Sequence, residues 1–450
     1  MTSMETVFLN DPWWLILIKV VGVFVLLLTW TIFNVWFERR VLGKMQNRKG
    51  PIMNGPLGLG QALGDGVKLL FKEDFRPART DALVFNIAPM LTAVAAFASW
   101  SVIPLGGPVR MFGIETRLQL TDLPVAALLV MAIAGVGFYG FVLAGWSSNG
   151  TYSLLGSMRA TAQVISYEIA MGLSLVAVFM YAGTMSTSQI VAAQAEPINL
   201  FGATIALPSW YGLLLLPSFV IYYVSMFGET NRQPFDMPEC ESELVSGHIT
   251  DYSGFRYALY FLAEYINVAT VSAVSVTLFL GGFHAPWPLN GTFLDQGWWT
   301  LLWFVLKVQI MIFTVAWVRA AVPRVRYDQM MKLGWKVLIP ANLAWIVLLA
   351  LVRGASVHGW WADPIFIGIL IVFLAAVVAA IWFSGPEPQP EAEPIDLDAE
   401  FDAFAGGYPV PPMPGQKLIT AVVAEGTAEP AGAAASSSAR RAATSNGAEL

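Results

Sequence analysis

Nine long apolar stretches, separated by polar connections, dominate the pattern along the chain. Each is close to the 20 residues that an α-helix needs to cross a bilayer. Every backbone group inside a membrane must be hydrogen-bonded within its own segment, so apolar runs of this length predict helices. We therefore expect an all-α polytopic membrane protein with about nine transmembrane helices, at residues 12–37, 82–103, 123–145, 160–181, 210–227, 255–283, 298–320, 334–352 and 364–383.

Composition supports this class and excludes several others. Hydrophobic residues make up 56% of the chain and charged residues 12%, whereas soluble domains carry about 25% charged residues. The single cysteine, Cys240, excludes an intrachain disulfide and a cysteine-held iron–sulfur cluster. The three histidines are scattered and lack haem or zinc spacing. A redox centre, if one is involved, is expected on another chain, and the expected surroundings are lipid, not nucleic acid.

Lysine and arginine collect in alternate connections, which predicts the orientation. The connections after the first and seventh apolar stretches are rich in these residues, whereas the intervening ones at 104–122, 182–209 and 284–297 contain only Arg110 and Arg117. Basic connections face the cytoplasm. The N-terminus is therefore expected outside, with the charged connections and the C-terminal tail in the cytoplasm.

The chain divides into three parts by composition. Residues 1–353 are expected to form the main membrane domain and residues 354–384 an additional C-terminal membrane helix. From residue 385 onward the chain is rich in Pro, Ala and Glu. Such a segment buries too little apolar surface to order itself, so we predict a mostly disordered tail.

The connection after the first apolar stretch predicts a surface helix beside a basic cluster. Leu63, Val67 and Phe71 fall on one face of a helix, and Asp65 and Lys68 on the other. This amphipathic helix is expected to lie in the membrane surface. Its lysines fit anchorage at lipid headgroups as well as they fit a functional role. The guanidinium groups nearby, those of Arg39, Arg40 and Arg48, could hold a partner's carboxylates or the polar head of a ligand.

An acidic connection, residues 228–247, provides the main candidate chemistry. It gathers five acids around one basic residue, Arg232, and the acids are Glu229, Asp236, Glu239, Glu241 and Glu243. Carboxylates this close repel one another, so some are expected to hold protons near neutral pH, as a proton relay requires. The alternative is a solvated surface that docks a basic partner. Interleaved apolar residues such as Phe235 and Leu244 predict partial burial and favour the relay.

Two further acids lie inside predicted membrane helices. Glu168 and Glu264 each lie about ten residues, or roughly 15 Å, from the cytoplasmic end of their stretch. Lone acids at this depth are costly and usually mark functional pathways. The alternative is a structural ion pair, with Lys307 or Lys19 as the partner.

These motifs resemble a known family. The H subunits of bacterial proton-translocating NADH:quinone oxidoreductase, respiratory complex I, carry a similar set in the same order. The matching segments are Glu38-Arg39-Arg40, 46–51, 145–149, 154–159, 163–168, 229–236, 241–245, 252–254, 261–265 and 326–329. The set extends over residues 12–352. The chain departs from the family at 50–54 and 64–66, and the family normally has eight membrane helices, so the ninth would be an addition.

The resemblance implies a role for each residue set. Residues of the first connection, Arg39, Arg48, Asp65 and Lys68, would lie around a quinone chamber or its entrance. The five acids of residues 228–247, together with Glu168 and Glu264, would form a proton relay. Quinone would be the substrate, while FMN, NADH and iron–sulfur clusters would be bound by partner subunits and none by this chain. The partners would be the hydrophilic quinone-module subunits and small membrane subunits, in the bacterial plasma membrane.

Two other functions stay open at this point. The membrane subunit of an energy-converting hydrogenase would share the fold and the acidic connection. A stand-alone proton-coupled transporter is the alternative from a different class, although we find no internal repeat and no broken helices in paired positions, which such transporters usually have.

Overall fold

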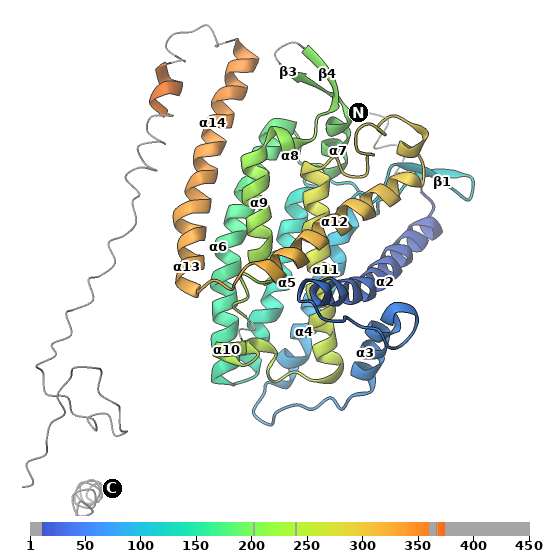
Figure 1. Cartoon of the computed structure of the whole chain (residues 1–450), viewed down its shortest axis with the longest axis vertical. Helices are drawn as coiled ribbons and strands as arrows, with labels where there is room; N and C mark the ends of the chain where they lie inside the picture. Colours follow the sequence, from blue (N-terminus) through green and yellow to red (C-terminus); the bar gives the residue numbers. More distant parts are fainter. Residues whose placement is uncertain (1–10, 201–202, 239–240, 360–365, 367, 374–450) are drawn as a thin grey trace, which may run out of the picture. The chain divides into compact units, whose positions relative to one another are not determined.

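A computed structural model describes residues 11–200, 203–238, 241–359, 366 and 368–373. Helices form most of this part of the chain (Figure 1). They are α2 (Trp13–Met45), α3 (Gly60–Phe71), α4 (Ala82–Ala98), α5 (Ala126–Ser147), α6 (Thr151–Ala182), α7 (Thr187–Ala195), α8 (Tyr211–Leu214), α9 (Leu216–Glu229), α10 (Glu241–Leu244), α11 (Gly254–Phe279), α12 (Trp299–Ala321), α13 (Tyr327–Lys332) and α14 (Ile339–His358).

Seven of the described helical segments are long and apolar enough to span a membrane. They correspond to the predicted stretches one to four and six to eight, so the polytopic all-α class is confirmed. The fifth stretch is broken: α8 ends at Leu214, and α9 begins at Leu216 with Pro217 in its first turn. Proline has no N–H to donate, so it ends one helix and starts the next. Most of the ninth predicted stretch and all of the predicted tail lie outside the described residues, and the three-part division stays a prediction.

Local signals explain where helices begin and end. The carboxylate of Asp81 accepts a hydrogen bond from the backbone N–H of Leu83 at 3.1 Å and caps α4. Gly183, at a φ of 72°, ends α6 in the left-handed conformation. The start of α6 was predicted wrongly, because the helix begins at Thr151, nine residues before the apolar stretch. Its first turns are partly polar and pack on the acidic connection, so hydropathy alone could not include them.

Small residues bring the helices close together. A Cβ atom at Gly140 of α5 would lie 2.6 Å from the carbonyl oxygen of Ala88 in α4, and one at Gly228 of α9 would lie 2.3 Å from the Tyr167 ring of α6. Only glycine fits at these two crossings. Close backbone approach through small residues is the usual way that membrane helices gain packing energy.

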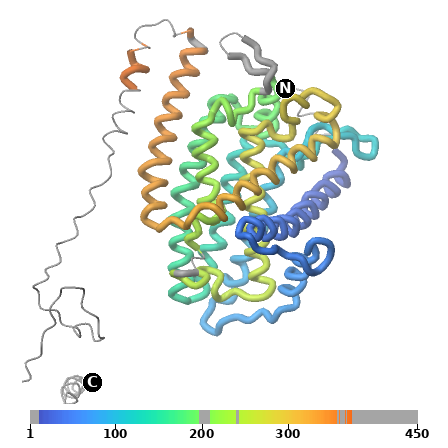
Figure 2. Tube along the Cα trace, in the orientation of Figure 1, coloured from blue at the N-terminus to red at the C-terminus, as the bar shows by residue number. Residues whose placement is uncertain are grey.

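The first connection and the acidic connection lie at the same end of the helices, as Figure 2 shows by their blue and yellow-green traces. The Ser253 hydroxyl donates to the carbonyl oxygen of Glu73 at 3.1 Å, and Arg256 pairs with Asp74 at 3.3 Å. The contacts tie the first connection to the chain just after the acidic connection and to the start of α11.

Two short hairpins were not predicted from the sequence. Strands β1 (Pro108–Met111) and β2 (Ile114–Arg117) pair antiparallel, as do β3 (Pro197–Leu200) and β4 (Ala203–Pro208). Each lies in one of the connections poor in basic residues. The strands are only four to six residues long, too short to stand out among nine apolar runs.

The amphipathic helix is confirmed as α3. Its apolar residues Leu63, Val67, Leu70 and Phe71 are exposed, with Phe71 at 88%. An apolar face that no described residue covers fits a helix lying in the membrane surface, as predicted.

Lys307 of α12 caps the end of α11 and does not pair with an intramembrane acid among the described residues. Its Nζ donates to the carbonyl oxygens of Leu280, Gly282 and His284 at 2.6, 3.0 and 2.7 Å, and lies 4.4 Å from the centre of the Trp210 ring. These carbonyls follow the C-terminus of α11, where a cation complements the helix dipole. The alternative that Lys307 or Lys19 pairs with Glu168 or Glu264 is therefore not seen in the described part of the chain, since Lys19 pairs with Asp11 at 2.5 Å.

Replacing Lys307 with Met is expected to destabilise the protein by on the order of 3 kcal/mol, because three carbonyl oxygens lose a charged donor. The fraction of assembled complex that survives a heat step would measure this loss. Lys44→Met, at an exposed position, is the matched control. Equal survival of the two variants would contradict the capping role.

Candidate functional site

A network of buried charges joins α2, α11, α12 and the segment after α9. Arg232 Nε lies 3.0 Å from Glu264 Oε1, and its Nη1 lies 3.5 Å from Glu38 Oε1. Glu38 also accepts hydrogen bonds from the Tyr265 hydroxyl at 2.7 Å and from Arg319. The Arg232 guanidinium stands 4.5 Å from the centre of the Tyr265 ring. Four charges, two of each sign, therefore meet here, with Arg232 and Glu38 largely buried and Glu264 and Arg319 partly exposed.

Arg232 is the shared countercharge of this network. Burial by itself would lower the pKa of Arg232, but Glu264 and Glu38 beside it outweigh burial and raise the pKa. The guanidinium therefore stays charged and holds both carboxylates. It is the actual partner of Glu264, in the place where the sequence suggested Lys307 or Lys19.

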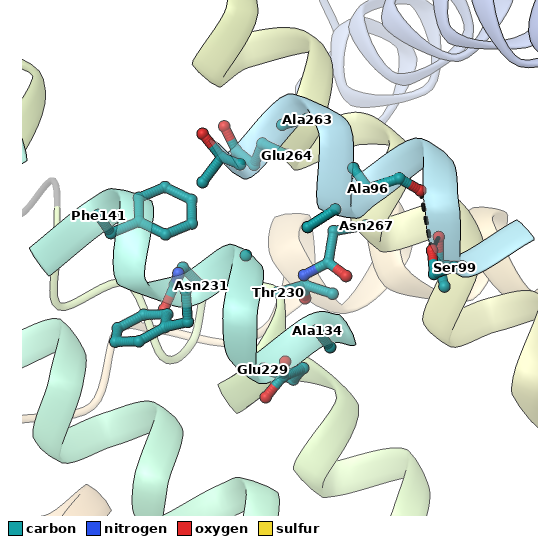
Figure 3. A pocket seen from close by; sticks show the side chains of 15 residues that line it. Ala96, Ser99, Ala134, Phe141, Glu229, Thr230, Asn231, Ala263, Glu264 and Asn267 are labelled. Atoms are coloured by element: carbon teal, nitrogen blue, oxygen red, sulfur yellow. Dashed lines mark hydrogen bonds between the residues drawn. The ribbon is translucent and has the colours of Figure 1, made fainter. Parts of the chain in front are cut away.

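A cavity of about 40 Å³ lies beside this network, and two of the predicted relay acids line it (Figure 3). Glu229 reaches it from the end of α9 and Glu264 from α11. Polar side chains that can hydrogen-bond to water also line it, namely Thr92, Ser99, Thr230, Asn231, Asn267 and Thr270. The remaining lining is small or aromatic, from α4, α5 and α11. The arrangement can hold water between two carboxylates.

Glu229 differs from Glu264 because no cation among the described residues pairs with it. It is 5% exposed, and its Oε2 has no hydrogen-bond partner in the part of the chain that the structure describes. It lies close enough to Glu168 for the two carboxylates to repel each other. A buried carboxylate without a countercharge favours holding a proton.

The acidic connection is held on α6 by one glutamine. The side-chain amide of Gln163 donates to the carbonyl oxygens of Gly228 and Phe235, both at 2.7 Å, and to Asn231 Oδ1 at 3.1 Å. The ring of Tyr167 packs against Phe235. The segment that follows α9 is therefore folded back onto the membrane helices and only partly solvated.

The remaining acids of the connection have different environments. Glu243 is exposed and pairs with Arg159 at 2.5 Å and Arg324 at 3.4 Å, so Arg232 is not the only basic residue that the connection meets. Asp236 is half-buried and lies near Glu264. Glu241 begins α10, and Glu239 lies outside the described residues. The structure therefore does not gather all five acids in one pocket.

Glu168 occupies a separate groove. It lies between α5 and α6 with apolar neighbours such as Leu128, Ile165 and Ile169, and it does not line the cavity that holds Glu229 and Glu264. The helix α6 starts well before the predicted stretch, so Glu168 is seventeen residues from its start while Glu264 is ten from the start of α11. Glu168 can act on the cavity through its repulsion of Glu229.

The first connection brings together two of its four predicted residues. Arg39 and Asp65 form an ion pair at 2.6 Å, and Gln61 also donates to Asp65 at 3.2 Å. Arg48 is exposed and donates to the side chain of Gln46 at 2.7 Å. Lys68, on the polar face of α3, is also exposed. The pair ties the end of α2 to the surface helix, and the other two cations stay accessible.

His248, next to the acidic connection, is buried between the rings of Phe141 and Tyr260. Burial lowers the pKa of His248 to about 3. It is therefore neutral at physiological pH, where the candidate proton sites are the carboxylates.

Sequence reasoning missed two members of the network. Glu38 was noted only as part of a motif, and Arg319 was not noted. Both are ionisable residues near the ends of apolar helices, and such residues usually mark functional sites. Applying that rule to arginine would have found Arg319, and applying it to the ends of the stretches would have found Glu38.

A bundle of membrane helices that buries ion-paired arginines and carboxylates beside a polar cavity belongs to the class of multi-pass proteins that handle charge within the bilayer. Comparison with known proteins narrows this class. The sequence profile of the NADH dehydrogenase family matches residues 18–350. A relative from Cutibacterium acnes, the H subunit of NADH-quinone oxidoreductase, is 61% identical over 411 residues, which cover 90% of this chain and 92% of the relative. A protein of the same name from Streptomyces avermitilis is 48% identical over 423 residues, covering 92% and 90%.

The chain belongs to this family, the H subunits of NADH-quinone oxidoreductase, and is therefore a membrane component of a translocase complex. The resemblance seen in the sequence motifs is confirmed. Other complex I subunits are accordingly its partners, which removes the hydrogenase and stand-alone transporter alternatives.

Proposed function

We propose that this chain forms the membrane part of the quinone-binding chamber and links quinone reduction to proton translocation. The observation that carries the proposal is the shared position of Arg232. Its guanidinium bridges Glu38 on α2, the helix that leads into the first connection, and Glu264, which lines the polar cavity. A change of charge near the first connection can therefore act electrostatically on the cavity through Arg232.

The chemistry requires protons as well as electrons. Reduction of a quinone to a quinol takes up two electrons and two protons. Within the proposal, FMN, NADH and the iron–sulfur clusters belong to hydrophilic partner subunits, and this chain supplies the membrane-side binding surface. Arg39, Arg48, Asp65 and Lys68 of the first connection line the chamber or its entrance. The exposed cations Arg48 and Lys68 suit the polar head of a ligand.

The acids then respond to charge at the chamber. A negative or proton-accepting quinone species near the acidic connection draws Arg232 toward itself, weakens its hold on Glu264 and favours protonation of that carboxylate. The protonation of Glu229 and Glu168 changes with that of Glu264, because neighbouring carboxylates titrate together. Asp236, Glu239, Glu241 and Glu243 are the further members that we propose for this relay.

Orientation is part of the same proposal. The basic first connection contacts the chain just after the acidic connection, and both connections face the cytoplasm of a bacterium, with the chain in its plasma membrane. The hairpins β1–β2 and β3–β4 then face outward.

The test measures protons and electrons together in inverted membrane vesicles. We expect Glu229→Gln and Glu264→Gln to lower the number of protons moved per NADH oxidised by severalfold or more, because neither amide can accept and release a proton. NADH:quinone activity and the vesicle pH gradient are recorded on the same sample. The control is Glu115→Gln, an exposed acid of β2. An unchanged proton-to-electron ratio in both cavity variants would overturn the proposed linkage.

A further inference from the structure

A crevice of about 220 Å³ lies at the other end of α2, away from the acidic connection. It is bounded by α2, the beginning of α12 and the segment around the β1–β2 hairpin. Its lining is mostly apolar and includes Ile18, Val23, Leu105 and Leu301, with two polar side chains, Lys19 and Gln119. Figure 1 shows the hairpin next to the start of α2.

Aromatic side chains indicate the depth of this crevice. Trp13 at the start of α2 is 77% exposed, Trp298 before α12 is 51% exposed, and Phe112 at the hairpin tip packs edge-on against Trp14. Exposed tryptophans at helix ends are typical of the membrane–water interface. Lys19 follows Trp13 by six residues, or about 9 Å along the helix. The crevice therefore opens just below the headgroup level.

The polar end of the crevice is formed by buried side chains that are held by hydrogen bonds. Lys19 is 8% exposed, and its ammonium donates to Asp11 and to the Thr116 hydroxyl, both at 2.5 Å. An ammonium has three protons to donate, so one is left after these two bonds. Gln119 adds a second buried polar group. The polar residues lie at the headgroup end, and the wall beyond them, past Gly22 and Val23, is apolar.

Gly22 gives the crevice its width. A Cβ atom added at Gly22 would meet no other atom within 4 Å. The neighbouring apolar residues Val21 and Val25 are about half exposed, as expected on a lipid-facing side. The apolar part of the crevice runs along α2 from Lys19 toward Leu26, a rise of about 10 Å.

We infer that this crevice binds one glycerophospholipid, with an ester or phosphate oxygen accepting from Lys19 and an acyl chain lying along Gly22. The direction of polarity, from the buried Lys19–Asp11 ion pair at the interface to the apolar part of the crevice below it, matches a phospholipid whose headgroup lies at this end of α2. A transmembrane helix, about 10–12 Å wide, is a poorer fit for a crevice of about 220 Å³. The inference goes beyond the proposed function and depends only on the membrane position of α2.

The matched variants are Gly22→Phe and Val21→Phe. Both add a ring to α2 in the bilayer, but only the first fills the crevice. The assembled complex is purified in mild detergent and its tightly bound phospholipid is counted by mass spectrometry. We expect wild type and Val21→Phe to retain the same number per complex and Gly22→Phe to retain one fewer, with NADH:quinone activity kept. Equal counts in all three would overturn the inference.

A second measurement covers the case in which Gly22→Phe fails to assemble. A phospholipid with a photoreactive acyl chain is added to the wild-type complex, and the labelled peptides are identified. Labelling of the segment around Gly22 that excess phospholipid suppresses would support the site. Labelling only elsewhere, or release of a quinone or a detergent in place of a phospholipid, would reject it. Because activity is recorded separately, failure here is distinguishable from failure of the proposed function.

Discussion

Replacing Arg232 with Ala is expected to remove assembled, active complex almost completely. Glu264 would then lose the cation that pairs with it, and Glu38 would keep only Arg319. Removing one partner of a buried ion pair costs about 3–5 kcal/mol, since the remaining charge is left uncompensated. NADH:quinone activity and the amount of this protein in purified complex are the two measurements.

The control is the same change at an exposed ion pair. Arg110 pairs with Glu115 at 2.6 Å, but its side chain is 77% exposed, against 8% for Arg232. Pairs of this kind contribute about 0–1 kcal/mol. Arg110→Ala is therefore expected to assemble normally. If Arg232→Ala behaved like Arg110→Ala, the charge network would have no part in holding the site.

Gly247→Ala is expected to disrupt the acidic connection as severely as the loss of Arg232. Gly247 has a φ of +53°, and a Cβ there would lie 1.6 Å from the carbonyl oxygen of Pro238. No rotamer relieves a clash between a Cβ and the backbone, so the chain at Gly247 and at Pro238 must move apart. We expect a loss of at least about 3 kcal/mol, within the range of the largest single-residue effects. Limited proteolysis of the connection and the yield of complex measure it.

Gly113→Ala separates the clash from backbone strain. Gly113 in the β1–β2 hairpin also has a positive φ, +85°, but a Cβ there would meet no atom within 4 Å. Its substitution is expected to cost only the left-handed strain, about 1–2 kcal/mol. Similar losses from both variants would show that strain, and not the approach of Pro238, makes Gly247 necessary.

The membrane helices were predictable because lipid imposes a simple rule. Runs of about 20 apolar residues must be helical, and seven of the predicted stretches are such helices in the described structure. The same rule failed where helices leave the lipid. The polar first turns of α6 depend on packing, and the interruption between α8 and α9 depends on Pro217. Hydropathy averaged over a stretch detects neither.

The candidate site was predicted in its composition but not in its pairing. Glu229 and Glu264 were both singled out, and they share a cavity. Their partners lie far away along the chain: Arg232 meets Glu38 across 194 positions, and Arg319 meets the same carboxylate across 281. Pattern and spacing report neighbours along one helix, so contacts among four separate segments could not be inferred from them. Glu168 was predicted at a depth similar to that of Glu264, but it lies in a separate groove, so similar depth in the membrane does not imply a shared cavity.

The three carbonyl oxygens around Lys307 also restrict which cation can stand there. They surround a single nitrogen at 2.6–3.0 Å, as a tripod would, and an ammonium matches this shape with its three protons. A guanidinium is flat and offers its protons as a fork, a geometry suited to carboxylates. Lysine and arginine are therefore not interchangeable at this position, although the charge is the same, because the site selects by shape.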